Sequence, residues 1–306
     1  MTEMRKVILV ARNSPVAVAT VGELGKFEIW NPDTGEQLTE FDSVYDSCGR
    51  LAISSNGERV IAANWRKGKK GGIACYDAAS GSELWHRTDI GQIQHMEFSP
   101  KGDRVWCEVD CRPVHCLDSQ SGSNLKILRA VNDVVESPYT DHTVLVKRED
   151  LVVETPLSRR TVPLLGWCRG VAFTPNAVCV SELMRTDNPN IHVGHIRCLD
   201  LKSGSERWHY RCPEACFIQL ISYQDDCSVY CVQSGNDGHR WIVDLIRLTS
   251  QDGSCTSICR LTPPPPYFGG FGNGILVTPH GEVVSLLTGD ILRILAFDDK
   301  PTDKAV

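Results

Sequence analysis

The sequence lacks an apolar run long enough to cross a membrane. No segment of its 306 residues approaches the roughly 18 consecutive apolar residues that a spanning helix needs. The apolar run near the start, Val7–Ala11, is also shorter than the roughly 7 to 15 residues of a secretory signal, and Arg12 and Pro15 follow it closely. We therefore expect a soluble, cytoplasmic protein.

The chain also lacks a strong excess of charge of one sign. Its net charge is −6, its pI is near 5.9, and 23% of its residues are charged. Such a chain has no general electrostatic attraction to nucleic acid or to anionic membranes. We therefore expect a protein partner, no nucleic acid and no membrane, and a chain that is monomeric on its own.

Recognisable catalytic motifs are missing as well. There is no Gly-x-Ser-x-Gly nucleophile motif and no phosphate-binding glycine loop. The glycine-rich segment at 269–274 follows four prolines and leads into a short strand, where a dinucleotide site would need a helix. We predict no catalytic residues and no cofactor.

Short apolar segments separated by turns recur along the whole chain. One series of turns ends in glycine, at Gly35, Gly81, Gly122, Gly204, Gly253 and Gly289. The steps between these glycines are 46, 41, 82, 49 and 36 residues, where 82 is a double interval. A second turn series from Asn13 to Asn273 has a mean step of about 43 residues. A repeat of this length built from short strands is typical of a β-propeller. We predict an all-β fold in which one domain, residues 1–306, forms a single seven-bladed propeller of four-stranded antiparallel blades. The blades are expected near residues 1–43, 44–91, 92–131, 132–166, 167–212, 213–262 and 263–306.

The predicted strands are apolar on both faces. Cys75 and Tyr76 are neighbours and point to opposite faces of one strand, as a sheet packed between two other sheets requires. The aspartates four residues before a turn glycine are expected to accept hydrogen bonds from the turn amides: Asp77, Asp118 and Asp200. The fourth unit has lost its turn glycine but keeps its strand lengths, which indicates a degenerate blade.

The fourteen cysteines would suggest disulfides in a small secreted chain, but this chain is large and shows no export signal. Cys75, Cys116 and Cys198 occupy a repeat position that isoleucine and valine fill elsewhere, so we expect them to act as small apolar side chains. No Cys-x-x-Cys turn occurs, and cysteines four apart on a strand lie roughly 13 Å apart, too far to share a metal. We predict structural thiols and no metal site; the least implausible metal cluster is His192, His195 and Cys198.

These repeats resemble those of WD-repeat and quinoprotein-like propellers. AISSNGERVIAA and FSPKGDRVWCE look like the first hairpin of WD repeats, although the recurrent Trp-Asp ending is absent, and YDAASGSELWHR and LDLKSGSERWHY look like quinoprotein-type repeats. The resemblance covers nearly the whole chain. It implies that Trp85 and Trp208 pack against the neighbouring blade, and it favours a shared fold more than a shared function.

In a propeller, the loops after the second and fourth strands of every blade leave on one face, here called the loop-bearing face. We predict that a protein partner binds there, because these loops hold residue types enriched in interface hot spots. The predicted partner-binding residues are Tyr45, Arg50, Trp65, Arg66, Arg112, Arg169, Met184 and Arg185. Trp65, beside a basic run, is the strongest candidate, whereas Trp167 and Trp241 could equally pack between blades. The function expected is a non-catalytic interaction module or scaffold, with toxin neutralisation and complex assembly both left open.

The alternative is a propeller enzyme with a metal or quinone site at the central mouth. Polar residues that could gather near the axis are His95, Glu97, Asp133, Glu136, Glu182 and Glu214. Their convergence cannot be read from sequence, and a bound metal or chromophore in purified protein would favour this alternative.

Overall fold

The structure is a computed structural model, and it describes residues 7–10, 17–21, 26–44, 50–63, 72–109, 113–185, 192–212, 215–222, 228–236, 241–260, 270–272, 275–277, 282–285 and 290–294. These residues form strands, turns and irregular connections. Within these ranges no helix is long and apolar enough to span a membrane.

Seven four-stranded sheets follow one another along the described chain, each made of four consecutive antiparallel strands. The first blade contains β1 (Val7–Val10), β2 (Ala17–Val21), β3 (Lys26–Asn31) and β4 (Glu36–Asp42). The second contains β5 (Arg50–Ile53), β6 (Arg59–Ala63), β7 (Ile73–Asp77) and β8 (Glu83–Arg87). The third contains β9 (Ile93–Phe98), β10 (Arg104–Val109), β11 (Val114–Asp118) and β12 (Asn124–Leu128). The fourth contains β13 (Asp133–Glu136), β14 (Thr143–Val146), β15 (Asp150–Glu154) and β16 (Arg159–Pro163).

The last three blades are built in the same way. The fifth contains β17 (Trp167–Thr174), β18 (Ala177–Arg185), β19 (His192–Asp200) and β20 (Glu206–Arg211). The sixth contains β21 (Ala215–Ser222), β22 (Ser228–Asn236), β23 (Trp241–Thr249) and β24 (Cys255–Arg260). The seventh contains β25 (Gly270–Gly272), β26 (Ile275–Val277), β27 (Glu282–Ser285) and β28 (Ile291–Ile294).

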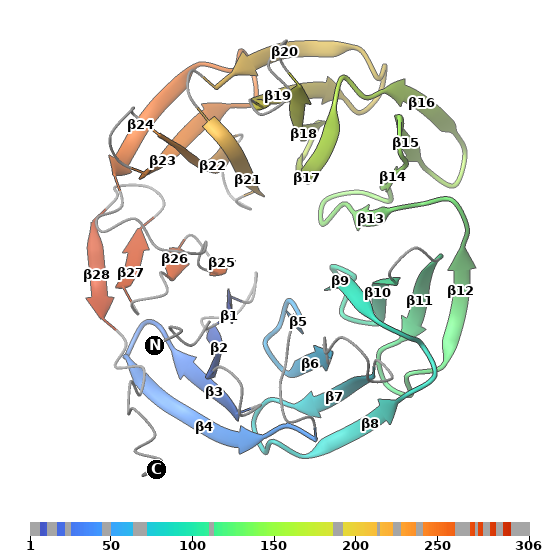
Figure 1. Cartoon of the computed structure of the whole chain (residues 1–306), viewed down its shortest axis with the longest axis vertical. Helices are drawn as coiled ribbons and strands as arrows, with labels where there is room; N and C mark the ends of the chain where they lie inside the picture. Colours follow the sequence, from blue (N-terminus) through green and yellow to red (C-terminus); the bar gives the residue numbers. More distant parts are fainter. Residues whose placement is uncertain are drawn as a thin grey trace.

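The seven sheets stand in a ring, with the first strand of each blade near the centre and the fourth on the rim (Figure 1). The ring closes without strand exchange, because β1 of the first blade contacts β25 and β26 of the last. The predicted all-β, seven-bladed fold is confirmed. Successive strands of a blade run in opposite directions, so strands of the first and third positions start on the loop-bearing face.

Large side chains on the outer strands join neighbouring blades. The ring of Trp85, on β8, lies so close to Gly122 in the turn of the next blade that an added Cβ would be 2.6 Å from Trp85 Cε3. Its Nε1 also donates to the Ser119 carbonyl at 3.0 Å. Trp208, on β20, contacts Gly253 in the same way. The inter-blade packing expected for both tryptophans is confirmed.

The aspartates of the glycine turns have the role that their repeated position predicts. Asp77 Oδ1 accepts hydrogen bonds from the Ser80 backbone at 2.8 Å and from its hydroxyl at 2.6 Å, and Asp118 and Asp200 do the same in their own turns. The hydrogen bonds from serine lower the pKa of Asp77 and that of Asp118. These carboxylates therefore stabilise turns.

The repeat cysteines are core residues. Cys75, Cys116 and Cys198 are buried, and the cysteines whose side chains the structure describes are free thiols. Burial raises the pKa of Cys75 to about 12 and that of Cys116 to about 11, so both stay neutral. Their predicted role as small apolar side chains is confirmed.

The fourth blade is regular although its turn glycine is missing. β13 to β16 pair without a register shift. The β15–β16 turn, residues 155–158, is closed by a hydrogen bond from the Thr155 amide to the Ser158 carbonyl at 2.8 Å. The degenerate unit is thus a complete blade with a tighter outer turn than its neighbours.

Candidate interaction site on the loop-bearing face

The structure describes part of the predicted partner-binding set. Tyr45, Trp65, Arg66 and Arg112 lie outside the described residues, and so does the side chain of Trp241. Arg50, Arg169, Met184 and Arg185 are described, and all four lie at strand ends on the loop-bearing face. These four residues therefore define the described part of the candidate site.

Arg185 contacts Trp167 at one corner of the fifth blade, and Arg169 and Met184 lie beside these two residues in the sequence. Trp167 starts β17 opposite Leu183 of β18, and Met184 and Arg185 follow at the end of β18. The Arg185 guanidinium carbon lies 4.7 Å from the Trp167 ring centroid, within the roughly 6 Å reach of a cation–π contact. Trp167 is 50% exposed, so this pair presents an aromatic surface and a cation to solvent. The sequence left open whether Trp167 packs between blades. Because half of its surface is exposed, Trp167 does not fill an inter-blade gap.

Two backbone features shape this corner. The β17–β18 register shifts between Cys168 and Gly170, which leaves Arg169 exposed in a β-bulge. A Cβ at Gly166 would collide with the Leu183 carbonyl oxygen, so glycine lets the chain pass close to β18 before β17 begins.

A buried ion pair holds the connection before Trp167. The side chains of Glu182 and Arg197 are 0% and 5% exposed, and Arg197 Nε donates to Glu182 Oε2 at 2.6 Å. Glu182 Oε1 accepts a hydrogen bond from the Leu165 amide at 2.6 Å, and Arg197 Nη2 donates to the Pro163 carbonyl at 2.8 Å. The pair therefore ties the linker from the fourth blade to β18 and β19, and fixes where β17 starts.

Two histidines lie beside this ion pair on β19 and β20. His195 Nδ1 is 2.6 Å from His209 Nε2. Burial lowers the pKa of His195, and His209 and Arg211 lower it further, so His195 is neutral near pH 7. The Nδ1 atom of His195 is thus hydrogen-bonded to His209. Within the described part of the chain, no group of three or more His, Cys, Asp or Glu side chains could hold a metal ion.

Polar contacts also join the inner strands around the central mouth. Arg50 Nε, at the start of β5, donates to the Gln94 carbonyl of β9. His95 Nδ1 of β9 lies 3.4 Å from Asp133 Oδ1 at the start of β13. Burial, together with Asp133 and other carboxylates, raises the pKa of Cys168 on β17 to about 12. Cys168 is therefore a thiol, unsuited to nucleophilic attack.

His95 is a cation at this mouth. Partial loss of solvent around the ring lowers its pKa, but Asp133, Glu97 and Glu108 outweigh this effect and raise the pKa to about 9. The side chains of His95 and Asp133 are 51% and 30% exposed, so the charged pair is open to solvent.

The polar residues of the enzyme alternative converge only in part. His95 and Asp133 meet at the loop-bearing mouth, with Glu97 of the same strand near enough to raise the pKa of His95. Glu136 lies at the opposite end of β13, and Glu182 is paired with Arg197 inside the fifth blade. Glu214 lies outside the described residues. A shared catalytic centre of these side chains is not formed among the described ones.

The comparisons with known proteins concern mainly the fold. The family profile described as outer membrane protein assembly factor BamB matches residues 6–128. A search of curated proteins gave no match. Among solved structures, the propeller domain of Cps50 (Swd1) from Myceliophteria thermophila has a TM-score of 0.65 at 12% identity, over 94% of this chain and 95% of that domain.

Two further structures have the same fold. Dihydro-heme d1 dehydrogenase NirN has a TM-score of 0.58 at 14% identity, over 92% of this chain and 64% of that protein. BamB from Moraxella catarrhalis has a TM-score of 0.54 at 16% identity, over 92% of this chain and 80% of that protein. The resemblance to WD-repeat and quinoprotein-like β-propellers predicted from the repeats is confirmed.

Proposed function

We propose that this β-propeller is an interaction module that binds a protein partner through its loop-bearing face. The observation that carries the proposal is the exposed Trp167–Arg185 pair, which begins directly after a linker held by the buried Glu182–Arg197 ion pair. Tryptophan and arginine are the commonest hot-spot residues, and side chains that are already positioned lose less entropy when a partner binds.

The described part of this face carries several cations, although the whole chain has a net charge of −6. Arg50, Arg169 and Arg185 lie on it, and His95 is protonated at its centre. A partner surface that combines acidic and apolar side chains complements it, and opposite charges speed the encounter.

The comparisons support an interaction role without selecting a partner. The matching family profile describes BamB as an assembly factor, and the β-propeller domain of Cps50 has the same architecture as this chain. Scaffolding, complex assembly and toxin neutralisation all fit within the proposal, as do the monomeric state and the cytoplasmic location expected from the sequence.

A propeller enzyme is the second candidate, and the His95–Asp133 pair is the observation that favours it. Paired histidine and carboxylate groups recur in acid–base catalysis, and NirN is a dehydrogenase with this fold. With a pKa of about 9, however, His95 is protonated at neutral pH and lacks the free lone pair of a general base. A metal ion or chromophore that copurifies with the protein would support this candidate.

Affinity capture tests the interaction role. Tagged wild-type protein is compared with the double variant Trp167→Ala, Arg185→Glu in lysate of the source organism, with detection by mass spectrometry. We expect a stoichiometric partner on the wild type and about tenfold or greater loss on the variant, since a hot-spot residue contributes about 2 kcal/mol or more.

The matched control carries the same kinds of change on the opposite face. Leu157→Ala with Lys101→Glu alters one exposed apolar and one exposed cationic side chain in turns of that face. This control should retain the partner. Equal retention by both double variants would refute the site, and the absence of any partner above background would refute the interaction role.

A further inference from the structure

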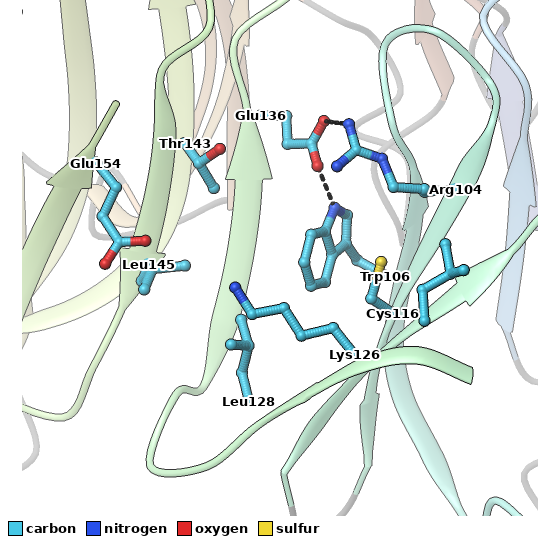
Figure 2. Close-up of a pocket in the computed structure, with 10 residues that line it drawn as sticks. Arg104, Trp106, Cys116, Lys126, Leu128, Glu136, Thr143, Leu145 and Glu154 are labelled. Atoms are coloured by element: carbon cyan, nitrogen blue, oxygen red, sulfur yellow. Dashed lines mark hydrogen bonds and ion pairs between the residues drawn. The ribbon is translucent and has the colours of Figure 1, made fainter. Parts of the chain in front are cut away.

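A pocket of about 290 Å³ lies between the third and fourth blades. Figure 2 shows Trp106 and Lys126 on one side of it, and Thr143, Leu145 and Glu154 on the other. The two sides belong to different blades, so the pocket is a gap in the packing between these two blades.

One residue replacement in the repeat explains part of this gap. In three blades the cysteine of the third strand pairs with an outer-strand residue in the same register: Cys75 with Trp85, Cys198 with Trp208, and Cys116 with Lys126. Lys126 thus occupies the position where the second and fifth blades have the tryptophan that fills the space to the next blade. The exposed Lys126 leaves that space open.

The missing glycine turn of the fourth blade explains the rest. Trp85 packs on the Gly122 turn of the following blade, and Trp208 packs on the Gly253 turn. The blade that follows Lys126 has instead the tight turn at residues 155–158. Both sides of the tryptophan–glycine contact that joins the second blade to the third and the fifth to the sixth are therefore absent at this junction.

The charged side chains that line the pocket, Arg104, Lys126, Glu136 and Glu154, sum to zero, but both carboxylates are already paired. Glu136 is paired with Arg104 at 3.0 Å, and Glu154 is paired with Arg159 at 3.2 Å. Lys126 has no hydrogen bond or ion pair with any residue that the structure describes. The cation available to a ligand is therefore the Lys126 ammonium, above an apolar wall.

We propose that this pocket binds a small organic carboxylate with an apolar body. Its carboxylate pairs with Lys126, and its aromatic or branched body packs against Trp106, Leu128 and Leu145. The volume matches the lower limit of small-molecule sites, about 300 Å³, and a charge-assisted contact at the rim of an apolar pocket is the usual way to orient such a ligand.

The probe for this site is 3-phenylpropionate, titrated into the full-length protein and followed through the Trp106 indole N–H, which donates to Glu136 at 2.8 Å. Trp106→Phe assigns this signal. We expect a saturable shift, and binding about tenfold or more tighter than that of the neutral 3-phenylpropionamide. Equal affinity for acid and amide, or no saturable shift with either, would overturn the proposal.

Variants of Lys126 test the site itself. Lys126→Gln removes the cation and should weaken binding of 3-phenylpropionate by about tenfold or more. Lys126→Trp installs the residue of the second and fifth blades, fills the gap and should abolish binding. Lys101→Gln removes a cation from a turn of the same blade and should change nothing. Binding retained by Lys126→Trp, with the indole spectrum otherwise unchanged, would contradict the site.

Discussion

The charged side chain of Glu182 is fully buried. Its side chain is 0% exposed, and both of its oxygens are hydrogen-bonded. Glu182→Ala leaves the buried Arg197 cation with only the longer ion pair to Glu206, at 3.7 Å, so we expect the free energy of unfolding in urea to fall by about 3–5 kcal/mol. Arg159→Ala, which removes one partner of an exposed ion pair, is the matched control and should cost about 0–1 kcal/mol. A similarly small loss for Glu182→Ala would contradict the role given to the pair.

His95 gives a pH dependence with a definite sign. Because its pKa rises from 6.5 to about 9 on folding, its protonation stabilises the folded state fully below pH 6.5, and this contribution is lost as the pH rises through 9. An NMR titration of the His95 ring should give a pKa of about 9 in the wild type. Asp133→Asn should lower this pKa, because burial then opposes the charge with less compensation. A wild-type pKa near 6.5 would show that Asp133 does not hold the cation.

The roles of single residues could be predicted from the sequence where the same position recurs in several blades. The turn role of Asp77 and the buried role of Cys75 follow from positions that recur in other blades. The Glu182–Arg197 pair occurs once and spans a hairpin, so it depends on a strand register that no repeated position reveals. The exposure of Trp167 depends likewise on where a bulge and a close backbone approach place it.

Among the elements, the contact between an outer-strand tryptophan and a turn glycine is the recurrent joint of the ring. Gly122 has a φ of 69°, and an added Cβ would lie 2.6 Å from the Trp85 ring. Gly122→Ala should therefore lower stability by about 1–3 kcal/mol from backbone strain alone. Thermal and urea unfolding measure this loss, with Gln120→Ala, an exposed change in the same turn, as the control. Equal stability of the two variants would argue against a tight joint at Gly122.

The strand and turn pattern was largely predictable, because two independent turn series count the same blades. The replacement of tryptophan by lysine between the third and fourth blades can also be seen in the sequence. Lys126 follows Gly122 by the same number of residues as Trp85 follows Gly81. The structural consequence of Lys126 could be recognised only in the structure, because the contact of Trp85 with the next blade shows which packing the lysine replaces.

At the scale of the whole molecule, sequence predicts the ring and the face on which its loops gather, since both follow from repeat length and strand alternation. It does not predict which side chains converge at the mouth. The neighbours His95 and Asp133 are brought together by two different blades, so their contact depends on how the sheets are set around the axis.

The most direct test of the loop-bearing face as the partner surface is hydrogen–deuterium exchange of the captured complex against the free protein. We predict slower exchange in peptides that contain Trp167–Arg169 and Leu183–Arg185. The turns of the opposite face at 119–122 and 155–158 should be unchanged. Protection confined to those opposite turns, with none near Trp167 and Arg185, would contradict the account.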